Sequence, residues 1–230
     1  MAASGSLAWP RNADGVRLPP VDHHIWGLQG IMHGMALDAR GRRCVRDLRY
    51  NTRSARTFGN HGLQVGDWFP CLYAAYFRGA HGLHQGGIYG TVAEGAYSIV
   101  VSGCFSGLDD DNGDTIWYCG PESRRNEDAL RPAPSSFGTL ALRESIRTGN
   151  SVRVLRSDSG RAAHAPARGI RYDGLYRVVR SRLAQAANRQ GGRYEQFELT
   201  RMPHQATLQS LRTGPTARPT AQESADYAAI

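Results

Sequence analysis

GGIYGTVAEGAYSIVVSGCFSGLDDDNGDTIWYCGP, residues 86–121, is the segment from which the architecture of this chain can be predicted. Ala96–Val101 (AYSIVV) is a short apolar run between glycines, which predicts a largely buried strand. Ser106–Asp114 is rich in polar turn formers and predicts a loop. Thr115–Tyr118 (TIWY) is again strand-like. Two strands therefore hold an acidic loop between them.

The acidic loop carries four carboxylates and has an aromatic residue at each edge, Phe105 before it and Tyr118 after it. The carboxylates belong to Asp109, Asp110, Asp111 and Asp114. Two rings and a carboxylate suit a flat, hydrogen-bonding guest, because a stacked base contributes about 1–3 kcal/mol and Asp accepts a hydrogen bond from cytosine N4. A solvated turn fits the same composition. Calcium binding is disfavoured, because no Glu follows at the closing position and no helix frames the loop.

Further motifs follow the same order as those of a known family. They are Gly87–Gly90 (GIYG), Glu94–Val100 (EGAYSIV), Asp109–Asp114 (DDDNGD), Tyr118–Gly120 (YCG) and Tyr172–Gly174 (YDG). Together they resemble the SRA (SET- and RING-associated) family, which is also named YDG. The resemblance implies an α+β, mainly β fold: a twisted, PUA-like β-barrel with short flanking helices and flexible termini. It also implies binding to duplex DNA, with a 5-methylcytosine flipped out of the helix.

The resemblance implies a base pocket in which Phe105 and Tyr118 sandwich the flipped base and Asp109 accepts from its Watson–Crick edge. One extra residue before the aspartate run leaves Asp110 as the alternative acid. The remaining predicted pocket residues are Gly87, Ile88, Cys104 and Cys119.

The same resemblance assigns two DNA-contacting loops. His84 and Gln85 fall at the thumb, where a glutamine can hydrogen-bond the guanine left without its partner. Glu122–Ser136 falls at the finger loop, but it lacks the Asn-Lys-Arg tip of family members that read hemimethylated CpG, so the sequence context and strand preference stay open. The predicted finger and backbone contacts are Arg124, Arg125, Asn126, Arg153 and Arg156.

Composition limits the alternatives. The formal net charge is +8 and the sequence contains no lysine, so arginine supplies all the basic side chains. This favours an anionic partner and excludes a lysine-dependent nuclease triad, a Schiff base and a P-loop. The four cysteines form no C-x-x-C pair, which disfavours a zinc ribbon or RING and favours a reducing compartment. We expect no cofactor and no metal, and the absence of a long apolar run or secretory signal predicts a soluble protein.

The chain divides into three predicted segments: residues 1–57 form a flexible arm and a helix, 58–201 the SRA domain, and 202–230 a disordered tail. The helix begins at Asp22 and carries Ile25, Trp26, Met32 and Met35 among its apolar residues.

Three elements of the predicted domain can be placed from their local patterns. Cys71–Phe77 predicts a strand, Thr139–Arg147 a short helix and Val152–Arg156 a strand. Arg40–Arg56 contains seven arginines, which fits either phosphate contact or a solvated helix face.

The predicted function is a nuclear, non-enzymatic reader of double-stranded DNA containing 5-methylcytosine, linked to epigenetic maintenance or silencing. Possible partners are chromatin, ubiquitin-ligase and methyltransferase proteins, with no membrane. Two alternatives stay open: a component of a ubiquitin-ligase or nuclease system that acts through a partner, and an interaction module without methyl selectivity.

Overall fold

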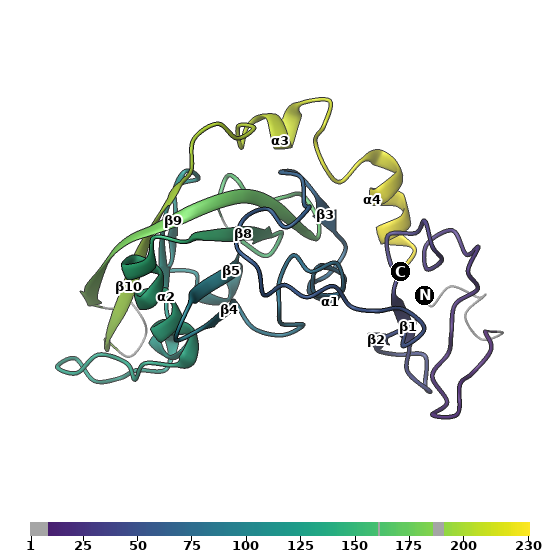
Figure 1. Ribbon diagram of the computed structural model, residues 1–230, viewed down its shortest axis with the longest axis horizontal. Coiled ribbons are helices and arrows are strands. Elements are labelled where there is room, and N and C mark those ends of the chain that lie inside the picture. The colour runs from purple at the N-terminus through teal and green to yellow at the C-terminus, as the bar shows by residue number, and fades with distance from the viewer. Residues whose placement is uncertain (1–8, 161, 186–190) are drawn as a thin grey trace.

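The structure is a computed structural model that describes residues 9–160, 162–185 and 191–230. A strongly curved sheet lies at one end of the molecule and an irregular N-terminal module, residues 9–56, lies at the other (Figure 1). The C-terminal segment passes over the sheet and returns to the N-terminal module, so both described ends of the chain lie on the same side (Figure 1).

The main sheet contains eight strands among the described residues, in the order β4-β5-β8-β9-β10-β7-β6, with β3 paired to β9. β5 and β8 pair in parallel and the other neighbours are antiparallel. The expected mainly β fold is confirmed; within the described part of the chain no pairing joins β4 to β6. The strands are β3 (Trp68–Phe69), β4 (Ile88–Thr91), β5 (Gly95–Val101), β6 (Asp110–Asp111), β7 (Thr115–Cys119), β8 (Ser151–Ser157), β9 (Ile170–Gln185) and β10 (Arg193–Arg201).

The core lies between the sheet and helix α2 (Phe137–Thr148). All seven residues of β5 are buried, as its apolar run predicts. The Ser136 hydroxyl caps α2 by accepting from the Thr139 N–H, and Gly149 ends the helix at φ 66°, a left-handed conformation that favours glycine. The predicted helix over 139–147 and the predicted strands around it are therefore confirmed.

The segment predicted as a strand at Cys71–Phe77 is instead helix α1 (Leu72–Phe77). Its side chains enter two different clusters: Leu72, Ala74 and Ala75 pack with the sheet, and Tyr73 and Phe77 pack with the N-terminal module. A helix that is apolar on both sides loses the one-faced periodicity that distinguishes it from a buried strand.

The helix predicted from Asp22 is also wrong, because residues 21–34 form successive turns that lead into β1 (Met35–Leu37) and β2 (Cys44–Arg46). The glycines explain the difference: a Cβ at Gly30 would lie 2.1 Å from the Ile25 carbonyl oxygen, so the chain folds more tightly there than a helix. The apolar residues nevertheless form a core, in which Ile25, Trp26, Met32, Met35, Trp9 and Phe77 are buried together.

Both predicted flexible termini need correction where the structure describes them. Residues 1–8 of the expected arm lie outside the described residues. Trp9 is buried, and the backbones of Arg11 and Arg17 form an isolated antiparallel β-bridge. The segment 202–230 forms helices α3 (Ser210–Thr213) and α4 (Ala221–Ala228).

Helix α4 contacts the N-terminal module, where the Asp226 carboxylate lies 2.7 Å from His24 Nε2. A capping box begins the helix, with the Thr220 hydroxyl accepting from the Glu223 N–H and the Glu223 carboxylate accepting from the Thr220 N–H. In the segment that precedes α4, the side chains of Leu208 and Leu211 are buried. A few apolar anchors and one cap are thus enough to order a stretch of otherwise polar composition.

Candidate base pocket

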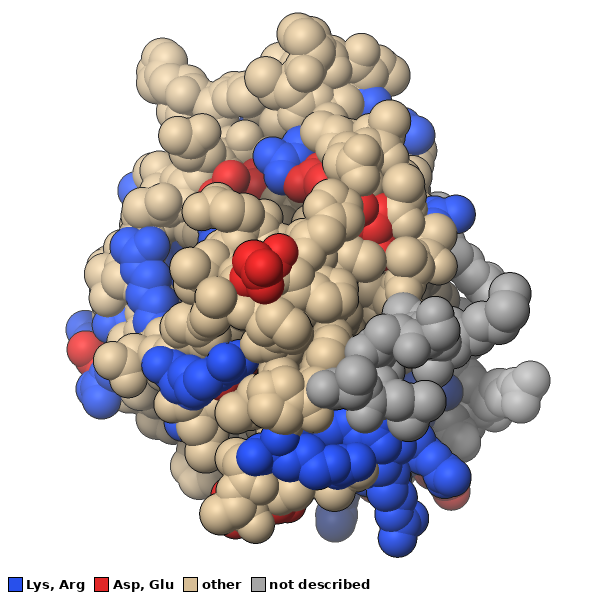
Figure 2. Space-filling model, turned by 90° about the vertical axis from the view of Figure 1, so that its right-hand side faces the viewer, with Lys and Arg blue, Asp and Glu red and all other residues tan. Residues whose placement is uncertain are grey.

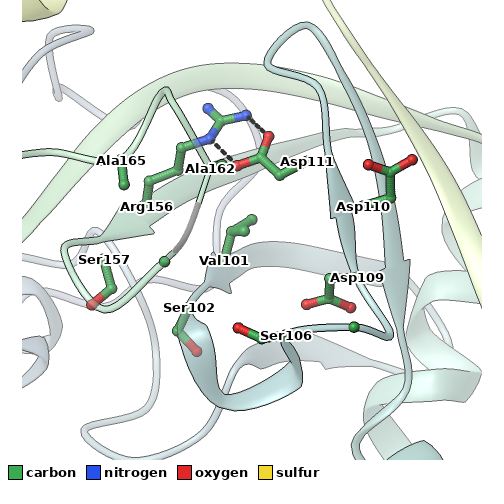
Figure 3. A pocket seen from close by; sticks show the side chains of 12 residues that line it. Val101, Ser102, Ser106, Asp109, Asp110, Asp111, Arg156, Ser157, Ala162 and Ala165 are labelled. Atoms are coloured by element: carbon green, nitrogen blue, oxygen red, sulfur yellow. Dashed lines mark hydrogen bonds and ion pairs between the residues drawn. The ribbon is translucent and has the colours of Figure 1, made fainter. Parts of the chain in front are cut away.

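The acidic loop forms one wall of a cavity of about 260 Å³. The loop leaves β5 through the short 3-10 helix η2 (Gly103–Phe105), and β6 and β7 carry it back into the sheet. Figure 3 shows the Asp109 carboxylate on the same side as Val101, Ser102 and Ser106, whereas Asp110 points away. The lining residues are Val101, Ser102, Ser106, Gly107, Asp109, Asp110, Asp111, Arg156, Ser157, Gly160, Ala162 and Ala165.

Asp109 presents one satisfied and one unsatisfied carboxylate oxygen. The backbone N–H of Cys119 donates to Oδ1 at 2.8 Å. Oδ2 is shielded from solvent and has no hydrogen-bond partner among the described residues. Burial raises the pKa of Asp109 to about 7, against the opposing effect of hydrogen bonds from Cys119. A buried carboxylate oxygen without a hydrogen-bond partner destabilises the fold, so its presence indicates a site that receives a hydrogen-bond donor.

Asp111, two residues later, is fully engaged. Its oxygens accept from Nε and Nη2 of Arg156 at 2.8 and 2.7 Å (Figure 3). The same guanidinium donates to the Gly113 carbonyl at 2.7 Å, which holds the turn at the tip of the loop. The bidentate pair therefore fixes the acidic loop to β8 and fixes the position of Asp109 indirectly.

The YDG motif supplies the second half of this network. Asp173 accepts from Nη1 of Arg156 at 2.8 Å and from Nη2 of Arg171 at 2.9 Å, and all three side chains are almost completely buried. The Tyr172 hydroxyl donates to Asn60 Oδ1 at 2.6 Å. Both residues are therefore parts of the structural framework.

Tyr118 lies in the core immediately beside Asp109. Its side chain is buried and its hydroxyl lies 3.1 Å from the carbonyl oxygens of both Gly87 and Val100. Burial raises the pKa of Tyr118 well above its usual value, with further contributions from Asp109, Cys119 and Cys104. A Cβ at position 87 would lie 2.6 Å from the Tyr118 hydroxyl, so glycine is needed there.

Phe105 is half-buried at the end of η2, where it packs against Leu108, Cys119 and Tyr194. Its carbonyl accepts from the Asp109 N–H at 2.9 Å. Neither Phe105 nor Tyr118 is among the side chains that line the cavity. Of the other predicted pocket residues, Ile88 is buried in the main core and Cys104 is exposed.

Comparison with known proteins decides the family. The SAD/SRA domain family matches residues 57–205. The chain belongs to the SAD/SRA domain family. The SRA domain thus comprises the sheet, α1 and α2, and the N-terminal module and α4 lie outside the matched residues.

Relatives cover this domain in larger proteins. The putative E3 ubiquitin-protein ligase ORTHRUS 4 of Arabidopsis thaliana is 35% identical over 127 residues, which are 52% of this chain and 20% of that protein. A UHRF1-like protein of Cryptococcus neoformans is 34% identical over 154 residues, 61% of this chain and 45% of that one. The chain therefore spans less than half of each of these two relatives.

Among solved structures, the complex of the SUVH5 SRA with hemimethylated CG DNA matches with a TM-score of 0.54 and 30% identity, covering 66% of this chain and 97% of that one. The modification-dependent TagI restriction endonuclease matches with a TM-score of 0.58 and 31% identity, covering 66% and 54%.

The predicted thumb loop is held at its base by a histidine that the sequence analysis did not single out. His81 is completely buried, with Nδ1 2.8 Å from the Ser98 hydroxyl and Nε2 3.2 Å from the Gly86 carbonyl oxygen. Burial lowers its pKa to about 4, so the imidazole is neutral at physiological pH. The predicted thumb residues His84 and Gln85 are exposed above this anchor.

The predicted finger loop, Glu122–Ser136, begins within the 3-10 helix η3 (Pro121–Arg124). Arg124 and Arg125 are exposed. Asn126 turns inward instead, and its amide donates to the carbonyls of Arg193 and Arg131 at 2.6 and 2.9 Å. The amide thus ties the predicted finger loop to β10.

The assignment of Arg153 and Arg156 to DNA contacts is corrected by their burial, since both are at most 1% exposed. Arg153 donates to the carbonyls of Ala55, Thr57, Gly59 and Ala80, and so joins the segment before the domain to β8. Arg156 is committed to the two aspartates described above. The signal available was their place in a strand flanked by valines and leucine, which buries both faces.

Two further observations concern the described residues as a whole. They contain no group of three or more His, Cys, Asp or Glu side chains placed to hold a metal ion. No helix among them has the length and apolar character needed to cross a bilayer.

Proposed function

We propose that this chain binds duplex DNA containing 5-methylcytosine and receives the flipped base beside Asp109. The observation that carries the proposal is the solvent-shielded, unpartnered Oδ2 of Asp109 at a cavity in an SRA domain. Solved SRA domains of similar fold are complexes with hemimethylated CG, methylated CHH and hydroxymethylated CG DNA.

The chemistry of the base fits the open acceptor. The exocyclic amine of cytosine is a donor, and a carboxylate that accepts from it forms a charge-assisted bond of about 1.5–3 kcal/mol. Extruding a base costs a few kcal/mol, which this bond, stacking and phosphate contacts together can offset. A buried methyl adds only about 0.8 kcal/mol, so the proposed preference for methylated DNA is modest unless unmethylated DNA meets an additional penalty.

Stacking requires a local change at Phe105. Tyr118 is fixed by its hydroxyl contacts to Gly87 and Val100. Phe105 is half-exposed on a short 3-10 turn whose neighbours Cys104 and Ser106 are exposed. We therefore place the adjustment on Phe105, which turns onto the base while Tyr118 remains in place.

The thumb and finger residues that remain exposed are proposed to contact the DNA around the extruded base. They are His84, Gln85, Arg124 and Arg125. Gln85 carries both a donor and an acceptor, so it can pair with the guanine left opposite the flipped base.

The N-terminal module is proposed to add phosphate contacts. Arg40, Arg42 and Arg43 are exposed in the connection between β1 and β2. Figure 2 shows arginine side chains gathered along the lower edge of this end of the molecule, where few acidic side chains accompany them. Replacing Arg42 and Arg43 by alanine should weaken binding to methylated and unmethylated duplexes equally, because phosphate contacts carry no sequence information. It should also reduce the salt dependence of binding.

The proposed setting is the nucleus, where the chain acts as a binding module without catalytic activity of its own. Relatives named as ubiquitin ligases and a neighbour named as a restriction endonuclease contain the same domain. A chain of this kind can therefore deliver such an activity to methylated DNA through a partner chain, which is the proposed alternative.

A second candidate function is an interaction module that has lost base recognition. It is favoured by one observation: both predicted stacking rings lie outside the lining of the cavity. This candidate predicts DNA binding through the basic surface alone, without dependence on methylation.

Binding of one duplex in unmethylated, hemimethylated and fully methylated forms tests the proposal. Fluorescence anisotropy at fixed salt concentration should show tighter binding to at least one methylated form. Equal affinity for all three would reject the reader and leave the interaction module.

A further inference from the structure

Arg17 places a guanidinium inside the N-terminal module without a counter-charge. Its backbone pairs with the end of β1: the Arg17 N–H donates to the Leu37 carbonyl at 2.8 Å, and the Leu37 N–H donates to the Arg17 carbonyl at 3.2 Å. The residue is 8% exposed. In the part of the chain that the structure describes, its side chain forms no hydrogen bond or ion pair, and Nε is shielded from solvent. Such a buried charge is costly, because no protein group replaces the water it has lost.

The Arg17 guanidinium lies against Gly41, in the turn between β1 and β2. A Cβ at position 41 would lie 2.7 Å from Arg17 Nη1 and 3.0 Å from its Cζ, so the contact requires glycine, which adopts φ 70° here. Arg40, Arg42 and Arg43 are exposed on the same turn. The buried guanidinium is therefore at the base of a basic surface patch.

Neighbouring groups do not supply the missing acceptor. Asp38 belongs to the same turn, but its carboxylate accepts from the Arg42 N–H at 2.8 Å. This hydrogen bond and those from other N–H groups of the turn lower the pKa of Asp38, so the backbone stabilises that charge. Arg11, whose backbone bridges to Arg17, donates to two backbone carbonyls at 2.9 and 2.8 Å. Arg17 is thus left with donors that an external acceptor would satisfy.

We propose that Arg17 and the turn 38–43 form a binding site for a phosphate group. The planar guanidinium offers paired N–H donors that match two phosphate oxygens, and the exposed arginines of the turn attract the anion. The inference deepens the phosphate contacts proposed for the N-terminal module and rests on that proposal for DNA as the source of the phosphate. It does not depend on base recognition at Asp109.

Two sources can supply the phosphate: the backbone of duplex DNA and a free phosphate in solution. A DNA phosphate at this site adds one contact to the interface, and each neutralised phosphate contributes about 0.9 to the slope of log affinity against log salt concentration. Free phosphate binds without DNA and stabilises the folded chain by mass action. The two sources therefore have different experimental signatures.

Thermal unfolding of the full chain in chloride and in inorganic phosphate, at equal ionic strength, tests the site. Phosphate at about five times its dissociation constant should raise the unfolding midpoint of the native chain by about 2–4 °C. Arg17→Met should lose this shift. In chloride it should unfold at the native temperature or above, because it removes an unpaired buried charge and keeps an apolar side chain. Arg212→Met, which removes an exposed arginine from α3, is the matched control and should respond like the native chain.

Gly41→Ala is a second variant that keeps the charge of Arg17. Its Cβ would displace the guanidinium from the turn. The shift produced by phosphate should therefore shrink relative to the variant's own midpoint in chloride, whatever the cost of the substitution to stability.

Binding of an unmethylated duplex at several salt concentrations identifies the source. If the phosphate belongs to DNA, Arg17→Met should reduce the magnitude of the salt slope by about 0.9, and Arg212→Met should not. Loss of the thermal shift with an unchanged slope would assign the site to free phosphate. The proposal is overturned if Arg17→Met retains both the native response to phosphate and the native slope. Because this duplex carries no methyl group, the result is separate from the methylation preference that tests the base pocket.

Discussion

Asp109 and Asp111 stand two residues apart in the same loop, yet they have opposite surroundings. Asp111 accepts two hydrogen bonds from Arg156 and belongs to a buried network with Asp173. Asp109 accepts from the backbone N–H of Cys119 at Oδ1, and its Oδ2 has no hydrogen-bond partner in the part of the chain that the structure describes. The two carboxylates therefore have different roles. Asp111 has all its hydrogen bonds satisfied and holds the loop, whereas Asp109 is held in place with one oxygen free to accept a hydrogen bond.

The largest expected effect comes from breaking the saturated network. Asp173→Ala leaves Arg156 and Arg171 without their shared carboxylate, and loss of one partner of a buried ion pair costs about 3–5 kcal/mol. Denaturant unfolding should show this loss. Asp110→Ala, at an exposed position in the same loop, should change the free energy of unfolding by less than about 0.5 kcal/mol. Equal effects of the two substitutions would remove the distinction between structural and open carboxylates.

A smaller loss of stability is expected on substitution of Arg153, the buried arginine of β8 whose guanidinium binds backbone carbonyls of the protein itself. Arg153→Met leaves backbone carbonyls of the segment 55–59 without their donor, at a cost of about 1–3 kcal/mol. Unfolding measurements should detect that cost, while the affinity of the folded variant for DNA stays unchanged. Weaker DNA binding at undiminished stability would return Arg153 to the DNA contacts.

Substitution of the open carboxylate, Asp109, should stabilise the fold, and the size of this stabilisation should depend on pH. The pKa of Asp109 in the folded chain is about 7, above its usual 3.8. The folded state therefore holds this proton when the unfolded chain has lost it, so the contribution of Asp109 to stability declines as pH rises from about 4 to 7 and is level above that.

Asp109→Asn removes this titration and should therefore stabilise the fold by about 2–3 kcal/mol more at pH 8 than at pH 5, since one pKa unit corresponds to about 1.4 kcal/mol. Thermal unfolding of both proteins at the two pH values measures the difference. Asp110→Asn is the matched control and should show no such pH dependence. A stability difference that is the same at both pH values would show that Asp109 is not a buried, titrating group.

The smallest effect on the fold is expected at the thumb. Gln85→Ala removes an exposed side chain and should leave the free energy of unfolding within about 0.5 kcal/mol of the native value. Its affinity for a methylated duplex should fall several-fold, because one neutral hydrogen bond is worth about 0.5–1.5 kcal/mol. Val92→Ala, exposed in the turn between β4 and β5, serves as the control. An unchanged affinity would exclude Gln85 from the DNA contacts.

The sheet and the acidic loop could be predicted because local pattern and tertiary role coincide there. The apolar run of β5 is buried throughout, and Asp109 lies beside Tyr118 and Cys119 because β6 and β7 pair in antiparallel register. Asp111 and Asp173 both contact the guanidinium of Arg156. This requires the folded sheet to bring β6, β8 and β9, which are far apart in sequence, close to one another. That arrangement is a property of the assembled sheet and has no local sequence signal.

The ends of the chain were mispredicted for a different reason. Glycines in residues 21–34 allow turns too tight for the helix that the apolar spacing suggests. The polar C-terminal segment is ordered by contacts with residues far away in sequence, such as Asp226 with His24. Composition measures the average of a segment, whereas a few anchoring side chains decide whether it folds.

The most direct test of the open-carboxylate account compares Asp109→Asn with Asp110→Asn in binding to matched methylated and unmethylated duplexes. The account predicts that Asp109→Asn loses the preference for the methylated duplex, with affinity for it reduced about 10-fold or more, while Asp110→Asn keeps both. If Asp109→Asn retains the native preference, or if Asp110→Asn is the variant that loses it, the open oxygen of Asp109 does not receive the base.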